Sequence, residues 1–206
     1  MAGAWSGTVC VFNARRNKLE SKLEGAASVR AVAYAPSQKQ IAAAQIDGQV
    51  KLWSVETGRV VGSFGDQGIL NALAFSEDGE TLVSASDDAK VRVLSGRMGR
   101  ELSSTRALEE GEGGVNAIAV SPNGESVAVG LQSGKVAIYH RVSGIREWLF
   151  EGHSGAVTTV TFESNLVVAT GSLDSTIRMW SIRDGIEVVR FDEHRGAVND
   201  LECKKV

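Results

Sequence analysis

Three residues near the end of the chain have the side-chain types of a hydrolytic triad: His153, Ser172 and Asp174. In such a triad a histidine takes the proton of a serine hydroxyl, while a carboxylate orients the imidazole. The serine must also stand at a pocket, beside groups that bind the developing oxyanion. All three residues instead fall within one short segment, residues 152–180, whose pattern predicts three strands and their turns. We therefore predict that they serve structure, that the chain has no catalytic residue and that it is not an enzyme.

Metal and phosphate chemistry also lack the residues that they need. The three histidines, His140, His153 and His194, are far apart, with no cysteine or histidine at ligand spacing. The glycine-rich segment 108–114 has neither a following Lys-Ser/Thr pair nor a strand-to-helix context, so it is not a phosphate loop. No helix is predicted, which removes helix N-termini as anion sites. We predict no metal site and no cofactor.

The segment that holds the three residues is built of alternating apolar runs. The runs are separated by turn residues and cover 157–162, 166–171, 176–180 and 186–191. Runs of this length with a period of two are typical of antiparallel strands joined by tight hairpins. The segment therefore predicts a small four-stranded antiparallel sheet.

The same pattern recurs along the whole chain. The residues that end the third run of each copy are Phe12, Trp53, Leu94, Tyr139 and Trp180, at spacings of 41, 41, 45 and 41. Five positions after each of them stands a residue that suits a tight turn: Asn17, Gly58, Gly99, Gly144 and Gly185. Glycine, and after it asparagine, best tolerates a positive φ, so we predict a positive φ at Asn17. A period near 40 with strand-rich units is typical of propeller blades.

The repeat resembles the WD-repeat β-propeller family. The last copy has the family's marks most fully: Gly152-His153 before the first strand, Ser172 in the second, Asp174 in the turn and Trp180 at the end of the third. The family's terminal Trp-Asp pair is intact in no copy, because the markers are followed by Ser54, Ser95, His140 and Ser181. The resemblance covers essentially the whole chain. It implies an all-β propeller of four-stranded antiparallel blades, with about five repeats.

The chain is predicted to form one domain, 1–206, that is a propeller or part of one. Its repeat units are 1–24 (partial), 29–64, 70–105, 115–150, 157–191 and 198–206 (partial). In the last unit, residues 198–203 are predicted to form a lone first strand. Three arrangements remain open: a closed five-bladed ring in which 198–203 pairs with the N-terminal strands, a segment of a larger ring, or a ring whose missing blades a partner supplies.

The resemblance also implies a buried structural tetrad of His153, Ser172, Asp174 and Trp180. In it, the indole N–H reaches the serine hydroxyl, the hydroxyl reaches the imidazole and the imidazole reaches the carboxylate. Such a network ties the loop before the first strand to the second hairpin. Other copies lack parts of it, since Leu94 replaces Trp in 70–105 and Gln45 stands in 29–64. We predict that those copies depend on apolar packing alone.

Two sets of positions resemble the partner-contact sites of the family, on the face around the channel. The second residues of the first strands are Arg30, Asn71, Asn116, Thr158 and Asn199. The residues before the second-hairpin turns are Trp5, Ile46, Asp87, Gln132 and Leu173. If exposed, Trp5, Ile46 and Leu173 beside Arg30 would form an apolar-plus-arginine patch, a composition enriched at interface hot spots. Alternatively, Trp5 is buried or lies at a trimmed end.

Composition narrows the classes of function. The 22 basic and 25 acidic residues are interspersed and give a net charge of −3, which argues against a polyanion-binding protein. No apolar run is long enough to span a bilayer, and no signal peptide is recognised. Cys10 and Cys203 both lie in predicted strands and are expected to be reduced thiols. We predict an intracellular protein in the cytoplasm, with a cytoskeletal or nuclear assembly as the alternative.

The predicted function is a non-enzymatic scaffold that binds other protein subunits in a larger assembly. No small-molecule substrate, nucleic acid or membrane is expected as a partner. The alternative is an enzyme, or a binder of a small ligand or nucleic acid, that uses the channel face.

Overall fold

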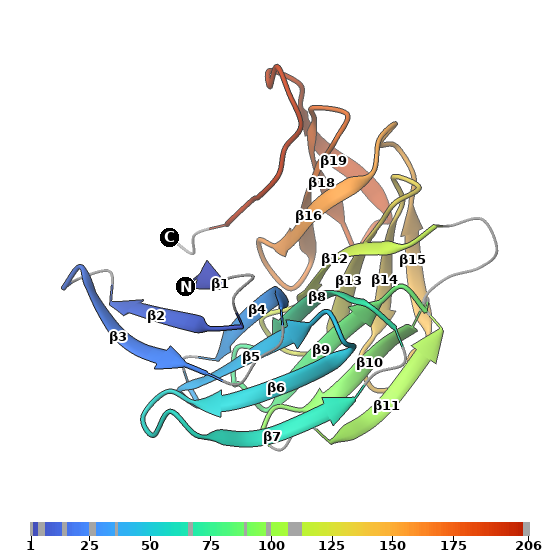
Figure 1. The fold of residues 1–206 in the computed structure, drawn as a ribbon. Coiled ribbons are helices and arrows are strands. Elements are labelled where there is room, and N and C mark those ends of the chain that lie inside the picture. The colour runs from blue at the N-terminus through green and yellow to red at the C-terminus, as the bar shows by residue number, and fades with distance from the viewer. Residues whose placement is uncertain are drawn as a thin grey trace.

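The computed structural model describes residues 2–3, 7–13, 16–24, 28–35, 37–65, 68–88, 90–97, 100–106 and 113–203. These residues form 19 strands in five antiparallel sheets, and no helix (Figure 1). The described part of the chain accordingly offers no helix with the length and apolar character of a membrane span. The prediction of an all-β chain built of four-stranded antiparallel repeats is confirmed.

We number the sheets in chain order. Sheet 1 contains β1 (Ala2–Gly3), β2 (Val9–Asn13) and β3 (Lys18–Leu23). Sheet 2 contains β4 (Val29–Ala35), β5 (Gln40–Gln45), β6 (Gln49–Ser54) and β7 (Val60–Gly65). Sheet 3 contains β8 (Leu70–Phe75), β9 (Thr81–Ser86), β10 (Lys90–Ser95) and β11 (Glu101–Arg106). Sheet 4 contains β12 (Val115–Val120), β13 (Ser126–Leu131), β14 (Val136–His140) and β15 (Arg146–Phe150). Sheet 5 contains β16 (Val157–Phe162), β17 (Val167–Ser172), β18 (Ile177–Ser181) and β19 (Ile186–Phe191).

The sheets follow one another around an arc (Figure 1). Within each full sheet the strands pair in chain order, and the first strands β4, β8, β12 and β16 lie side by side nearest the centre. The fourth strands lie on the outside of the arc. Loops at one end of the sheets are thereby collected around a common centre, and this arrangement positions the candidate site.

The hydrophobic core lies between the sheets rather than within any one of them. In sheets 2 to 5, the residue that ends the third run packs on the sheet before it: Trp53, Leu94, Tyr139 and Trp180. Trp180 stacks on Phe150 of sheet 4, with ring centroids 5.1 Å apart. Truncating a buried aromatic side chain to alanine costs about 3–5 kcal/mol. In sheet 1, where the described residues place no sheet in front, Phe12 at this position is 54% exposed.

The C-terminal segment differs from the prediction. Residues 198–203 form no strand, and the structure places Cys203 outside any strand while Cys10 lies in β2. Val198 still sits where a next first strand would begin, because it is buried against Gly171 as Val157 is against Gly130. A strand needs a second strand to pair its main chain. Among the described residues, 198–203 makes no main-chain hydrogen bond to β1 or β2, so a closed ring is not shown.

The turns after the third strands follow the predicted backbone geometry. Asn17 has a φ of 47°, and the glycines at the same position, Gly58, Gly144 and Gly185, have φ values of 66°, 67° and 71°. The positive φ predicted at Asn17 is confirmed. Gly99, the remaining member of the series, lies outside the described residues.

This geometry makes substitutions at Asn17 a test of the turn. Asn17→Gly should leave the free energy of unfolding unchanged or raise it slightly, because glycine meets a positive φ without steric cost. Asn17→Val should lower it by about 1 kcal/mol or more, because a β-branched side chain is strained in this region. Chemical denaturation measures both variants, and a valine variant as stable as the natural chain would contradict the assignment.

Candidate functional site

His153 is the centre of a buried hydrogen-bond network in sheet 5. It precedes β16, is 6% exposed, and places Nδ1 3.0 Å from Oδ2 of Asp174. Its Nε2 lies 2.8 Å from Oγ1 of Thr170. The same hydroxyl oxygen accepts the indole N–H of Trp180 at 2.9 Å. Thr176 adds a hydroxyl that donates to Asp174 at 2.7 Å. The network joins the loop before the first strand to the second and third strands.

Ser172 does not belong to this network, so the prediction for Ser172 is wrong. Its hydroxyl donates to the carbonyl oxygen of Gly155 at 2.9 Å and accepts the main-chain N–H of Asp174 at 3.1 Å. Ser172 therefore fixes the hairpin by main-chain contacts and leaves the indole to another hydroxyl.

Strand register explains the difference. Trp180 pairs with Val168, so Thr170 is its diagonal neighbour, while Ser172 lies four residues away, about 13 Å along the strand. Diagonal neighbours two residues away are within reach of a large aromatic side chain. Thr170 is the functional residue that the sequence reasoning missed, and the register of the second and third strands is the signal that would have identified it.

The electrostatics of the network favour a neutral imidazole. Burial lowers the pKa of His153, and the hydrogen bond to Asp174 does not fully offset this effect. Burial raises the pKa of Asp174, but hydrogen bonds from Thr176, His153 and the N–H of Ser154 outweigh it and hold this pKa well below its usual range. A neutral His153 can donate a hydrogen bond from Nδ1 to Asp174 and accept one at Nε2 from the hydroxyl of Thr170. With this arrangement, both ring nitrogens and the Thr170 hydroxyl are hydrogen-bonded. With each of these groups hydrogen-bonded inside the sheet, the network stabilises the sheet and presents no nucleophile to a ligand.

Sheet 3 uses a different polar network, so the prediction that it depends on apolar packing alone is wrong. Arg92, which is buried in β10, lies 2.7 Å from Oδ2 of Asp88 and 3.3 Å from the hydroxyl of Ser86. Burial raises the pKa of Asp88, but hydrogen bonds from Arg92 and Ser86 lower it to about 2. The arginine at the same register in sheet 5, Arg178, pairs with Glu187 at 2.5 Å.

Sheets 2 and 3 each have only one of the two polar groups that form the Trp180–Thr170 hydrogen bond in sheet 5. In sheet 2, Ala43 stands at the register of Thr170, and the buried indole N–H of Trp53 has no partner among the described residues. In sheet 3, Ser84 stands at that register, but Leu94 replaces the tryptophan, and the Ser84 hydroxyl is likewise buried without a described partner. A buried polar group without a hydrogen bond destabilises the fold.

The second residue of each described first strand lies in a β-bulge. The register shifts occur at residues 29–31, 70–72, 115–117 and 157–159. A bulge re-aims the side chain of the extra residue. Accordingly Asn71 donates to the carbonyl oxygen of Val115 at 3.0 Å, and Asn116 donates to that of Val157 at 3.2 Å. These predicted contact residues therefore also connect neighbouring sheets.

The same connection continues at the end of the arc. Thr158 donates its hydroxyl to the carbonyl oxygen of Val198. Asn199 is exposed and outside any strand. Arg30, the bulged residue of β4, is exposed, and its side chain makes no hydrogen bond or ion pair within the described residues. Arg30 therefore differs from Asn71, Asn116 and Thr158, each of which bonds to the segment that follows it in the arc.

The residues before the second-hairpin turns are fixed by their main chains. The N–H groups of Ile46, Asp87, Gln132 and Leu173 donate to carbonyl oxygens of the loop before the first strand, at 2.8–3.0 Å. Side chains of two of them also return to this loop, since Asp87 accepts the N–H of Ile69 at 2.7 Å and Gln132 accepts that of Gly114 at 3.4 Å. Trp5 lies outside the described residues.

We call the edge formed by the second-hairpin turns the rim; its described members include Ile46, Asp87, Gln132 and Leu173. Two apolar side chains of the rim are exposed to solvent. Ile46 is 48% exposed and Leu173 is 55% exposed. Ile46 lines a hollow of about 270 Å³ with Ser28, Val29 and Arg30, whereas Leu173 belongs to sheet 5 and does not line it. Of the predicted patch of Trp5, Ile46 and Leu173 beside Arg30, only Ile46 and Arg30 line this hollow among the described residues.

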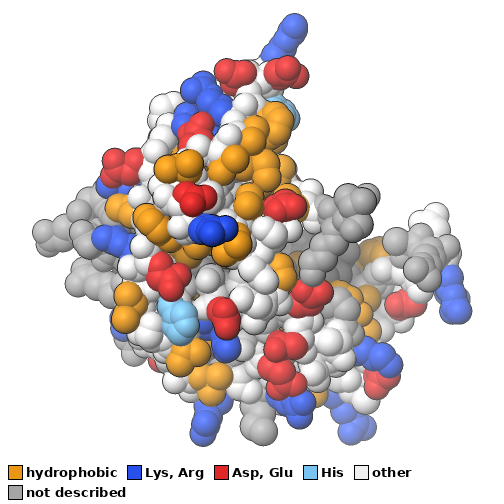
Figure 2. All heavy atoms as spheres, turned by 180° about the vertical axis from the view of Figure 1, so that it is seen from behind, with side chains coloured by type: hydrophobic (Ala, Val, Ile, Leu, Met, Phe, Trp, Pro, Cys, Tyr) orange, Lys and Arg blue, Asp and Glu red, His pale blue; other side chains and the backbone are white. Residues whose placement is uncertain are grey.

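Further exposed apolar side chains lie away from the rim. Seen from behind, hydrophobic side chains gather toward the end of the molecule that sheet 5 occupies (Figure 2). In β19 of this sheet, Ile186, Val188 and Phe191 are at least 48% exposed. No group of three or more His, Cys, Asp or Glu side chains in the described ranges is arranged to hold a metal ion.

Comparisons with known proteins place these repeats in a known class. A family model described as "WD domain, G-beta repeat" matches residues 17–54, 58–95 and 144–181, together more than half of the chain. Each match ends one residue after a third-strand marker: Trp53, Leu94 or Trp180.

Several curated proteins are similar over most of the chain. Telomerase protein component 1 of Rattus norvegicus is 31% identical over 183 residues, 88% of this chain and 7% of that protein. Angio-associated migratory cell protein of Homo sapiens is 25% identical over 186 residues, 82% of this chain and 43% of that protein. E3 ubiquitin-protein ligase COP1 of Arabidopsis thaliana is 28% identical over 170 residues, 79% of this chain and 24% of that protein. The chain therefore spans less than half the length of these relatives.

The contact between Trp180 and Thr170 can be measured by a double-mutant cycle. Trp180→Phe and Thr170→Val each remove one partner of the same hydrogen bond, so their effects on the free energy of unfolding should not add. We expect a coupling energy of about 0.5–1.5 kcal/mol from chemical denaturation. The control pair, Trp180→Phe with Ser172→Ala, should be additive within about 0.5 kcal/mol. Coupling in the control pair alone would restore Ser172 to the network.

The buried hydroxyl of Ser84 in sheet 3 has no described partner, so removing it should stabilise the protein. Ser84→Ala should raise the free energy of unfolding by about 1 kcal/mol, because it removes a buried hydroxyl that has no described partner. The matched control is Ser86→Ala in the same strand, which breaks contacts to Asp88 and Arg92 and should lower stability by a similar amount. Thermal unfolding compares them, and a destabilised Ser84→Ala variant would show that the hydroxyl has a partner.

Proposed function

Because the chain belongs to the WD40 repeat family, we propose that it is a non-enzymatic scaffold that binds other proteins within a larger assembly. The proposal is supported chiefly by the exposed apolar side chains of the rim. There, Ile46 and Leu173 expose apolar side chains from hairpins whose main chains are locked to the neighbouring loop. A partner that docks on such positions loses little free energy to ordering the surface.

The relatives support the assembly part of the proposal. One of them is by its name a component of telomerase, and this chain matches only 7% of that protein. Domains of this architecture host many unrelated functions, so the exposed side chains of the surface, and not the fold, determine what such a domain binds. The proposal includes an intracellular, cytoplasmic location, supported by two cysteines that are both free thiols.

An enzyme is the competing class, and the titratable groups do not favour it. Three groups with shifted pKa values, His153, Asp174 and Asp88, belong to two different sheets and are hydrogen-bonded inside them. Catalysis would need such groups to converge on one pocket. Nucleic-acid binding is disfavoured because the net charge is −3.

The scaffold proposal predicts that partners depend on the rim. The tagged chain is used to capture proteins from a native lysate of cells that express it, and bound proteins are quantified by mass spectrometry. The double variant Ile46→Ser, Leu173→Ser should lose at least one protein that the natural chain retains by about tenfold, a loss of about 1.4 kcal/mol. Both side chains are about half exposed, so thermal unfolding should be unchanged.

The matched control removes apolar surface from the other end of the strands. Val142 and Ile145, in the turn between β14 and β15, are 69% and 65% exposed. The double variant Val142→Ser, Ile145→Ser should retain the rim-dependent partner. Equal loss in both variants, or no protein that depends on the rim, would overturn the proposal.

A further inference from the structure

The four full sheets allow an internal comparison at the bulged second residue of the first strand. In sheets 3, 4 and 5 this side chain is Asn71, Asn116 or Thr158, and each donates to a carbonyl oxygen of the segment that follows in the arc. In sheet 2 the residue is Arg30, which makes no such bond in the described structure. The chain thus departs from its own structural rule at one position, and the departing residue is a cation.

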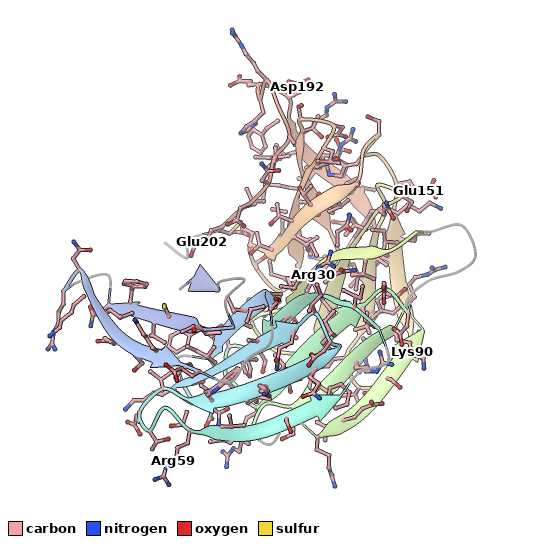
Figure 3. All side chains as sticks on the ribbon, viewed as in Figure 1. Arg30, Arg59, Lys90, Glu151, Asp192 and Glu202 are labelled. Carbon is pink, nitrogen blue, oxygen red and sulfur yellow. The ribbon has the colours of Figure 1, made fainter. Side chains whose placement is uncertain are left out.

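Arg30 lies at a hollow with an apolar wall. Ser28, Val29, Arg30 and Ile46 line a space of about 270 Å³. The N–H of Ile46 donates to the carbonyl oxygen of Ser28 at 2.9 Å, which fixes two sides of the hollow to each other. Arg30 lies near the centre of the arc, where the first strands converge, and far from Arg59 at the lower edge (Figure 3). The hollow that Arg30 lines therefore lies toward the centre of the arc.

Among the residues that the structure describes, no acidic side chain of the neighbouring turns pairs with Arg30. Asp47 uses Oδ1 to accept the N–H of Gln49 at 3.1 Å, and Asp87 uses Oδ1 to accept the N–H of Ile69 at 2.7 Å. Neither forms an ion pair with Arg30. A guanidinium group keeps its charge at every physiological pH and presents a planar fork of donors that matches a carboxylate.

We propose that this hollow binds an acidic peptide segment of a partner protein. A Glu or Asp carboxylate of the partner accepts hydrogen bonds from Arg30, and a neighbouring aliphatic side chain packs on Ile46 and Val29. The charge of Arg30 and the exposed apolar wall select this chemistry together. The inference rests on the proposed scaffold function and specifies the partner segment that one part of the rim recognises.

The test uses short synthetic peptides on an array, probed with the purified full chain. Each peptide has Glu, Gln or phosphoserine at its centre, and the flanking positions are randomised. Glu-centred peptides should be retained about tenfold more than Gln-centred ones, the ratio expected for one charge-assisted hydrogen bond. Retained sequences should be enriched in Leu, Ile or Val next to the glutamate.

Three variants assign the effect to the hollow. Arg30→Ala should abolish the preference for Glu, while Ile46→Ser should keep it and lose the aliphatic enrichment. Arg59→Ala removes an exposed arginine at a distant turn and should behave as the natural chain. Equal retention of Glu and Gln peptides, a Glu preference that survives Arg30→Ala, or retention of phosphoserine peptides alone would overturn the inference.

This outcome is separable from the test of the scaffold function. A rim-dependent partner in the lysate together with no Glu preference on the array would refute the acidic-peptide inference and leave the scaffold proposal standing. Absence of any rim-dependent partner would refute the scaffold proposal itself.

Discussion

The packing of each sheet on the sheet before it is the contact on which the rest of the structure depends. A four-stranded antiparallel sheet with two apolar faces cannot bury either face by itself. The residue that ends each third run therefore inserts into the preceding sheet, as Trp180 does against Phe150. Where no preceding sheet is described, the equivalent Phe12 is about half exposed. The stability of one sheet thus depends on its neighbour. Successive pairs of packed sheets also hold their second hairpins at a common edge, and this edge is the rim.

Polar networks in the repeats then differ in how much they add to this packing. Sheet 5 has the full chain of hydrogen bonds from Trp180 through Thr170 and His153 to Asp174. Sheet 3 replaces it with the buried pair of Arg92 and Asp88. The attraction within a buried ion pair offsets the cost of desolvating both charges only when the geometry is good. The Arg92–Asp88 pair therefore fixes the position of the hairpin, but it is weak evidence that the hairpin is more stable. In both sheets the second hairpin is held to the loop before the first strand, but the side chains that support the hairpin differ.

The sequence was sufficient for the repeat and insufficient for the contacts within it. Spacing alone located the third-strand markers and the positive φ of Asn17, because both follow from local geometry that recurs in every copy. It could not separate Thr170 from Ser172, since both face the same side of β17 and only the pairing of Trp180 with Val168 decides which hydroxyl the indole reaches.

The bulges were hidden for a similar reason. A bulge adds one residue without an apolar signal, so the alternation that revealed the strands gave no indication that Asn71 and Asn116 turn toward the neighbouring sheet. The structure thus divides residues that looked equivalent in the sequence. Those that bond to the next first strand are needed by the arc itself. In the equivalent bulge of β4, the exposed Arg30 has no such bond among the described residues and lines a hollow with Ile46. The contacts that distinguish these positions depend on which sheet follows in the arc, and the alternation of the sequence does not encode them.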